Sequence, residues 1–126
     1  MNETVLLVDD SGLARRGTRR ILEGAGYRVI EAEDGLAALE RYALDRPTVV
    51  LLDLVMRGMY GLEVLGKLRE IDPDARVIVI SADIQTSARD LVREAGASGF
   101  LNKPVDAEQL LAAVGRAIAG ESDRWN

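Results

Sequence analysis

The sequence predicts an α/β fold in which a doubly wound parallel sheet of five strands carries helices on both faces. Three short runs rich in Val, Leu and Ile indicate strands that are buried on both faces: Val5–Val8, Val49–Leu52 and Val77–Ile80. Helical patterns fill the intervals between strands, and this alternation predicts a parallel sheet with right-handed crossovers. A chain of 126 residues favours one domain with a single sizeable core.

The first half of the chain is predicted to hold three strands and two helices. A helix follows the first strand, and its apolar face is formed by Ala14, Thr18, Ile21, Leu22 and Ala25. Gly26 ends this helix, and residues 27–32 form the second strand. The second helix begins after the N-cap residue Asp34 and ends before Pro47. Its predicted apolar face consists of Leu36, Leu39 and Ala43.

The second half is predicted to repeat this pattern after the strand 49–52. The third helix presents Leu62, Leu65 and Leu68, and it ends near Asp72. The fourth helix presents Ala88, Leu91, Val92 and Ala95, and a short fifth strand follows at 98–101. The fifth helix is capped by Asp106 and presents Leu110, Leu111, Val114 and Ile118. We expect residues 1–120 to form the domain and 121–126 a short tail, with Trp125 exposed.

Composition excludes several classes of site. The chain has no cysteine and no histidine, so disulfides, thiolate or imidazole metal sites, histidine triads and a histidine phosphoacceptor are excluded. A net charge of −5 argues against direct nucleic-acid binding. The N-terminus does not resemble a signal peptide, and no apolar run approaches the ~20 residues that span a bilayer. These observations predict a soluble cytoplasmic protein without membrane contact.

Five polar side chains occur where the predicted buried strands end: Asp9, Asp10, Asp53, Ser81 and Lys103. The carboxyl ends of parallel strands lie at one edge of a sheet, which is where open α/β sheets bind ligands. Clustered carboxylates repel one another, and a hard divalent cation such as Mg²⁺ relieves that repulsion with oxygen ligands. An ammonium and a hydroxyl beside the carboxylates suit an anionic ligand. The set predicts phosphoryl transfer onto Asp53.

Each of these residues also has a simpler interpretation when it is taken alone. The pair Asp9–Asp10 could be a solvated turn that caps the first helix together with Ser11. Asp53 could be a surface carboxylate at the end of a strand, Ser81 could cap the helix that follows it, and Lys103 could be an ordinary loop lysine. Phe100, in the fifth predicted strand, could simply be a core residue. The sheet topology favours the common site because it brings the ends of the strands together.

Four sequence blocks, VLLVDDSG, VVLLDLVMRGMYG, VIVISAD and GFLNKP, resemble the signature blocks of response-regulator receiver domains, the CheY-like family. The resemblance extends from about Val5 to Ala119 and implies a flavodoxin-like (βα)5 sheet with strand order 2-1-3-4-5. It implies that Asp53 is the phosphoacceptor. Asp10 and Asp53 would bind Mg²⁺ or Mn²⁺ through their side chains, Val55 through its backbone carbonyl, and Asp9 through water.

The resemblance also assigns a conformational switch. Lys103 would contact a phosphate oxygen, Ser81 would turn toward the phosphate, and Phe100 would be the aromatic switch residue. The bond before Pro104 would be cis. The residues that tune dephosphorylation in this family correspond to Val55 and Asp83.

Three further features concern surfaces. The family usually has proline where this chain has Arg57, and an acid or Asn where it has Tyr60, so we expect a looser loop after the acceptor.

The first helix carries four arginines close together: Arg15, Arg16, Arg19 and Arg20. They form either a solvated face or, with Pro104, a docking patch for a phosphodonor, which would mainly raise the association rate.

The expected function is a stand-alone receiver that takes a phosphoryl group from a sensor histidine kinase or histidine phosphotransfer protein. It would catalyse only its own phosphorylation and dephosphorylation. The resemblance implies that a protein partner would bind the surface formed by the fourth helix, fifth strand and fifth helix, in chemotaxis-type signalling. The alternatives are a phosphorelay shuttle and a receiver excised from a larger regulator, although the start at Met1 favours a complete chain. We expect a monomer, with dimerisation upon phosphorylation as a second option.

Other classes fit less well. An aspartate-nucleophile phosphatase would carry its nucleophile after the first strand in an Asp-x-Asp motif. A flavin mononucleotide binder would have a Ser/Thr-rich loop there, and a P-loop nucleotidase would need G-x-x-x-x-G-K-[ST].

Overall fold

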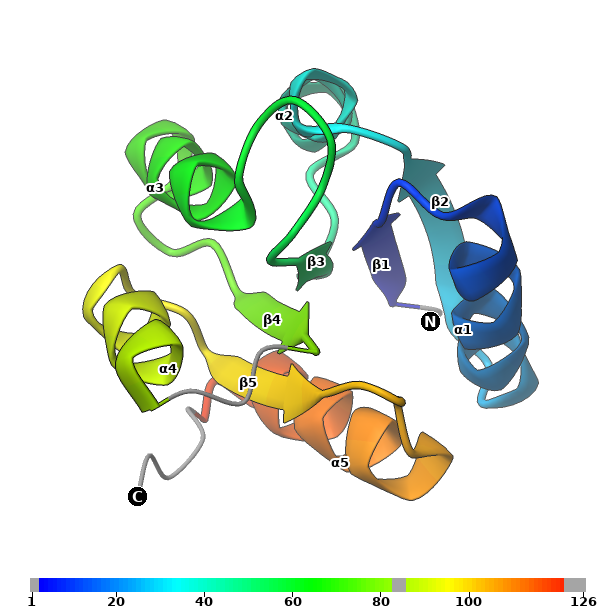
Figure 1. Cartoon of the computed structure of the whole chain (residues 1–126). Helices are drawn as coiled ribbons and strands as arrows, with labels where there is room; N and C mark the ends of the chain where they lie inside the picture. The colour runs from blue at the N-terminus through cyan, green and yellow to red at the C-terminus, as the bar shows by residue number, and fades with distance from the viewer. Residues whose placement is uncertain (1–2, 83–85, 122–126) are drawn as a thin grey trace.

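The computed structural model describes residues 3–82 and 86–121, and in this part of the chain five strands alternate with five helices (Figure 1). The strands are β1 (Thr4–Val8), β2 (Arg28–Ala32), β3 (Val49–Asp53), β4 (Val77–Ser81) and β5 (Gly99–Asn102). The helices are α1 (Gly12–Gly24), α2 (Gly35–Asp45), α3 (Gly61–Ile71), α4 (Thr86–Glu94) and α5 (Ala107–Ile118). The predicted alternation is confirmed.

The five strands form one parallel sheet in the order β2-β1-β3-β4-β5. Figure 1 shows α1 and α5 on one face of this sheet and α2, α3 and α4 on the other. In the register of the sheet, Asp53 pairs with Ile80 and Ser81 with Asn102. The ends of β3, β4 and β5 therefore lie at the same edge, as predicted.

Within the residues that the structure describes, three helices begin after a residue whose side chain caps them. Asp34 accepts a hydrogen bond from the backbone N–H of Ala37 at 2.8 Å, and Asp106 accepts one from Gln109 at 2.9 Å. These two caps confirm the prediction. The cap of α1 is Ser11, whose hydroxyl accepts from the N–H of Ala14 at 3.1 Å, so Asp9 and Asp10 are not needed for that role.

The predicted apolar face of α2 is confirmed for Leu39, which is partly buried and packs against the core, and is wrong for Leu36 and Ala43. Leu36 is 69% exposed and Ala43 is also exposed, whereas Ala38 and Tyr42 are buried. Small residues face the core because α2 lies close to its neighbours: a Cβ on Gly35 would lie 2.9 Å from side-chain atoms of both Met59 and Val64.

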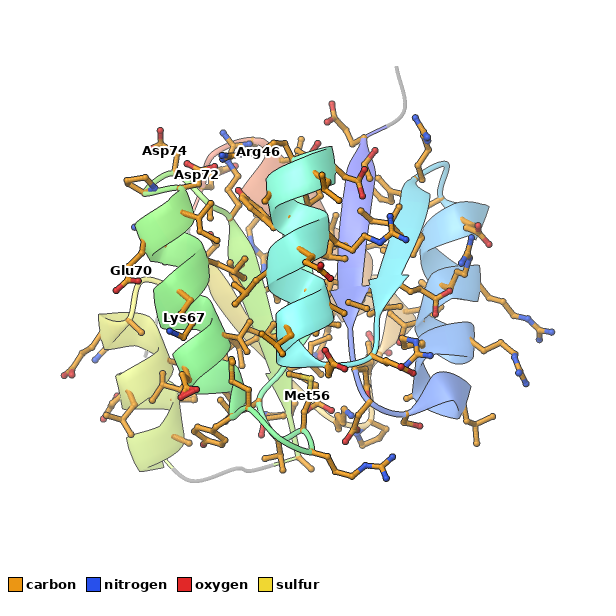
Figure 2. All side chains as sticks on the ribbon, turned by 90° about the horizontal axis from the view of Figure 1, so that it is seen from above. Arg46, Met56, Lys67, Glu70, Asp72 and Asp74 are labelled. Atoms are coloured by element: carbon orange, nitrogen blue, oxygen red, sulfur yellow. The ribbon has the colours of Figure 1, made fainter. Side chains whose placement is uncertain are left out.

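The side chain of Tyr42 is buried at the edge of the core, and its hydroxyl group forms a hydrogen bond. Its hydroxyl donates to Asp72 Oδ2 at 2.7 Å, and Arg46 lies 3.5 Å from the same oxygen. Figure 2 shows Arg46 and Asp72 near one another at one end of α2 and α3, with Met56 at the other end.

Two other positions depart from the predicted helix faces. Leu91 on α4 is 51% exposed rather than buried, and Ala25 is an exposed C-cap residue of α1.

Within the described residues, none of the helices is long and apolar enough to cross a membrane. Trp125 and Asp83 lie outside those residues.

Candidate functional site

The carboxyl edge of the sheet brings three carboxylates together. Asp53 is the last residue of β3, and Asp9 and Asp10 directly follow β1. Asp9, Asp10 and Asp53 each place one carboxylate oxygen within 4.8 Å of the others. Asp9 and Asp53 are buried, whereas Asp10 is partly exposed. The sequence prediction of one acidic cluster agrees with this geometry.

Lys103 contacts two members of the cluster. Its Nζ lies 3.1 Å from Asp53 Oδ2 and 3.3 Å from Asp9 Oδ2. The backbone N–H of Lys103 donates to the carbonyl of Ser81 at 2.9 Å, and the bond between Lys103 and Pro104 is cis, as the resemblance implied. The hydrogen bond to Ser81 holds the backbone of Lys103 beside the end of β4.

Burial and pairing shift the pKa values of this group in opposing ways. Burial raises the pKa of Asp53 above its ordinary value, and the ammonium of Lys103 only partly offsets that effect. Burial lowers the pKa of Lys103, but its hydrogen bond with Asp53 and the charges of Asp53 and Asp9 outweigh burial and raise it. Lys103 therefore offsets part of the cost of ionising Asp53.

The predicted switch residues lie on β4 and β5. Ser81 is fully buried at the end of β4, and Phe100 is buried in the core beneath α4. The guanidinium carbon of Arg89 lies 5.8 Å from the centre of the Phe100 ring. Phe100 thus packs inward in this conformation, so a core role and a switch role both agree with its position.

The loop from β3 to α3 passes close to Asp53. A Cβ on Gly61 would lie only 2.5 Å from the carbonyl oxygen of Asp53, so glycine is required for this close approach. Val55 follows Asp53 with its side chain 61% exposed, and its N–H donates to Asp53 Oδ1 at 3.3 Å. Arg57 also contacts the cluster, because its N–H donates to Asp10 Oδ2 at 2.9 Å.

The donor set fits a hard divalent cation. Three carboxylates and one ammonium leave a net charge of −2, and every side-chain ligand on offer is an oxygen. Mg²⁺ prefers such ligands and commonly uses one or two carboxylates in a site. The three residues Asp9, Asp10 and Asp53 are therefore suited to hold it.

Two of the four arginines on α1 are paired within the molecule, which sequence reasoning missed. Arg15 Nε lies 2.9 Å from Glu31 Oε1, and Arg19 contacts both Glu31 and Glu23. Arg15 also donates to the carbonyl of Asp9. The hydrogen bonds from the two arginines lower the pKa of Glu31 despite its partial burial, which by itself raises it. No sequence signal joined Glu31 on β2 to the arginines of α1.

A cavity of about 330 Å³ opens beside Asp53 and Lys103. Its walls come from α1 and from the segment after β5, and include Leu13, Gly17 and Pro104. Leu13 is 77% exposed. Sequence reasoning did not single out Leu13 or Gly17, although both lie on the helix that it proposed for docking.

Comparisons with known proteins agree with this arrangement. The family model of the response regulator receiver domain matches residues 5–115. The response regulator MprA of Mycobacterium ulcerans is 41% identical over 112 residues, which cover 89% of this chain and 48% of MprA. The chain therefore spans about half the length of the curated relatives it matches.

Several solved structures have a similar shape. A CheY-like receiver domain protein from Methanospirillum hungatei has a TM-score of 0.90 at 25% identity, with 95% of this chain and 96% of that chain covered. A LuxR-family two-component response regulator from Aurantimonas has a TM-score of 0.91 at 32% identity, with coverages of 97% and 89%. A chain of the CheX-CheY-BeF3-Mg complex from Borrelia burgdorferi has a TM-score of 0.86 at 33% identity, with coverages of 89% and 86%.

The matched range covers β1 through most of α5 and includes all three carboxylates, Ser81 and Lys103. This chain belongs to the response regulator receiver domain family of two-component systems.

Proposed function

We propose that Asp53 accepts a phosphoryl group from the phosphohistidine of a sensor histidine kinase or histidine phosphotransfer protein. The observation that carries this proposal is the buried Asp53 carboxylate, which lies 3.1 Å from Lys103 and within the acidic cluster. A carboxylate oxygen attacks phosphorus, the P–N bond breaks, and the histidine nitrogen keeps the electron pair. The product is an aspartyl phosphate.

The side chains of Asp10 and Asp53, the carbonyl of Val55 and, through water, Asp9 would hold Mg²⁺ or Mn²⁺. When bound, the cation supplies positive charge for the carboxylates and the phosphoryl oxygens. Lys103 would transfer one of its contacts to a phosphoryl oxygen. The similar chain from Borrelia burgdorferi was solved in a complex that contains both Mg and BeF3, which supports a cation in this role.

Signal output would depend on Ser81 and Phe100. The phosphoryl group adds roughly −1.5 to −2 charge, which would draw the hydroxyl of Ser81 and repack Phe100. A protein partner would then bind at α4, β5 and α5. Val55 and Asp83 would set the lifetime of the phosphate.

Docking of the phosphodonor would use α1 and the segment that begins at Pro104. The cavity beside Asp53 between these two segments supports this placement. Because Arg15 and Arg19 are already paired with Glu31, Arg16 and Arg20 are the more available charges on this helix. Arg15 and Arg19, which pair with Glu31, would form the edge of the docking surface.

For the pathway we propose a cytoplasmic signalling receiver that acts without enzymatic turnover of external substrates and without direct nucleic-acid contact. The three candidate outputs are chemotaxis-type signalling, a phosphorelay shuttle and a receiver within a longer regulator. The similar proteins are themselves diverse, since they include MprA, a LuxR-family regulator and a chain of the CheX–CheY complex. We propose a monomer, with dimerisation upon phosphorylation as the second option.

The decisive experiment is incubation with acetyl phosphate and Mg²⁺, followed by intact mass measurement. We expect a hydroxylamine-labile adduct that is absent from Asp53→Asn. Steady hydrolysis of external phosphate esters without an adduct would overturn the proposal in favour of a phosphatase. A pull-down that compares beryllofluoride-treated and untreated protein would then separate a motor or regulator partner from a phosphotransferase.

A further inference from the structure

Each carboxylate of the acidic cluster has a cationic partner, and the partner of Asp10 is Arg57. Lys103 contacts Asp9 and Asp53. Arg57 instead lies at Asp10, with its Nε 3.7 Å from Asp10 Oδ2 and its backbone N–H donating to the same oxygen at 2.9 Å. The two residues are 47 positions apart in the chain, so the loop after β3 is tied back to the segment after β1.

We propose that the guanidinium of Arg57 is an exchangeable counter-ion that competes with Mg²⁺ for Asp10 and thereby sets the cation affinity of the site. The inference rests on the proposed function, because it concerns the same cluster. Arg57 acts through Asp10 and is a positioning residue rather than a catalytic one.

The geometry separates two roles of Arg57. The backbone N–H holds Asp10 Oδ2 whatever the side chain is, as long as the residue is not proline. The guanidinium adds a positive charge at the rim of the cluster. Any divalent cation that binds Asp10 must approach this charge and displace its contact, so both effects weaken cation binding.

Exposure makes the exchange easy. The Arg57 side chain is 91% exposed, whereas that of Asp10 is 27% exposed. An exposed ion pair contributes little free energy, so a cation can displace the guanidinium readily. Arg57 also lines a hollow of about 390 Å³ together with Asp34 and Glu63, and these acids lower the electrostatic cost of a guanidinium that has left Asp10.

The test is a calorimetric Mg²⁺ titration of the full chain in five forms: wild type, Arg57→Gln, Arg57→Lys, Arg41→Gln and Asp10→Asn. Arg41 is the matched control, since it is an exposed arginine that pairs with Asp45 on α2. We expect Arg57→Gln to bind Mg²⁺ about two- to fivefold more tightly than wild type. Arg57→Lys should stay within about twofold of wild type, and Arg41→Gln should equal it.

Salt adds an independent readout. The gain of Arg57→Gln should shrink at about 1 M salt, where the screening length falls to about 3 Å. An unchanged or weaker affinity in Arg57→Gln, while Asp10→Asn abolishes binding, would overturn the role of Arg57 and leave the metal site intact. Absence of Mg²⁺ binding by the wild type would overturn both the metal site and this inference.

Discussion

The contact between α3 and the end of β3 leaves no room for a side chain at Gly61, and Gly61→Ala tests this directly. A Cβ at this position would lie 2.5 Å from the carbonyl oxygen of Asp53 and 2.7 Å from the Cα of Leu54. Both are backbone atoms of a buried segment, so they cannot rotate away as a flexible side chain could. The helix or the end of β3 must move.

The expected loss of stability follows from this overlap. Overpacking a close contact costs about 1–3 kcal/mol, and alanine recovers less than about 1 kcal/mol through its helix propensity. We therefore expect Gly61→Ala to lower the free energy of unfolding by about 1–2 kcal/mol. With urea slopes of about 1–3 kcal/mol per molar, the midpoint should fall by on the order of 1 M.

Gly66→Ala is the matched control on the same helix. A Cβ at Gly66 would have nothing within 4 Å, so alanine should raise the free energy of unfolding by up to about 1 kcal/mol. Urea denaturation followed by circular dichroism measures both variants. The reasoning is refuted if Gly61→Ala unfolds at or above the wild-type midpoint, or if the two variants shift it in the same direction.

Three further predictions concern stability and charge. Tyr42→Phe should cost about 1 kcal/mol by removing the hydrogen bond to Asp72, and Tyr60→Phe, at an exposed position, should cost nothing measurable by urea denaturation. The hydroxyl of Tyr42 lowers the pKa of Asp72, and burial raises the pKa of Tyr42 to about 12, so this cost should be constant from about pH 5 to 9. The cost of Tyr42→Phe should shrink below pH 3.8, where Asp72 becomes protonated, and above pH 10, where the tyrosine of the unfolded chain ionises. A cost that grows toward low pH would contradict this. Ser11→Ala should cost about 1 kcal/mol through loss of the α1 cap, as measured by thermal unfolding, and Ser11→Asp should retain most of the stability. Asp53→Asn should stabilise the metal-free protein, because it removes a buried charge beside Asp9, and should abolish stabilisation by Mg²⁺; a lower midpoint in EDTA would contradict this.

Sequence alone predicted the strands and the acidic cluster because both depend on strong, regular signals. A wholly apolar run of four residues has few structural interpretations, and the topology of a parallel sheet then fixes where its carboxyl end lies. Asp53 and Ser81 follow such runs directly, so their placement needed no side-chain detail. The cis bond before Pro104 was predicted from the family resemblance and not from the residues.

The helix faces were less predictable because close packing decides them. On α2 the large residue Leu36 is exposed, while Gly35 and Ala38 face the core. Hydrophobicity ranks leucine above glycine as a core residue, but the short distance from Gly35 to Met59 admits only a small residue. The pairing of Arg57 with Asp10 was equally hidden, since it joins two loops that only the folded sheet brings together.

The site combines two requirements that oppose each other. The proposed phosphoryl acceptance requires an ionised Asp53, yet burial at the end of β3 raises its pKa and makes the charged form costly. Lys103 offsets part of that cost for Asp53 and also contacts Asp9, and Arg57 contacts Asp10 from a more exposed position. The remaining negative charge is what a divalent cation neutralises, so cation binding should stabilise the fold as well as prepare the acceptor. Stability and the proposed phosphoryl acceptance are therefore linked through the same carboxylates. A substitution that makes the metal-free protein more stable by removing one of these carboxylates should also prevent phosphorylation of Asp53.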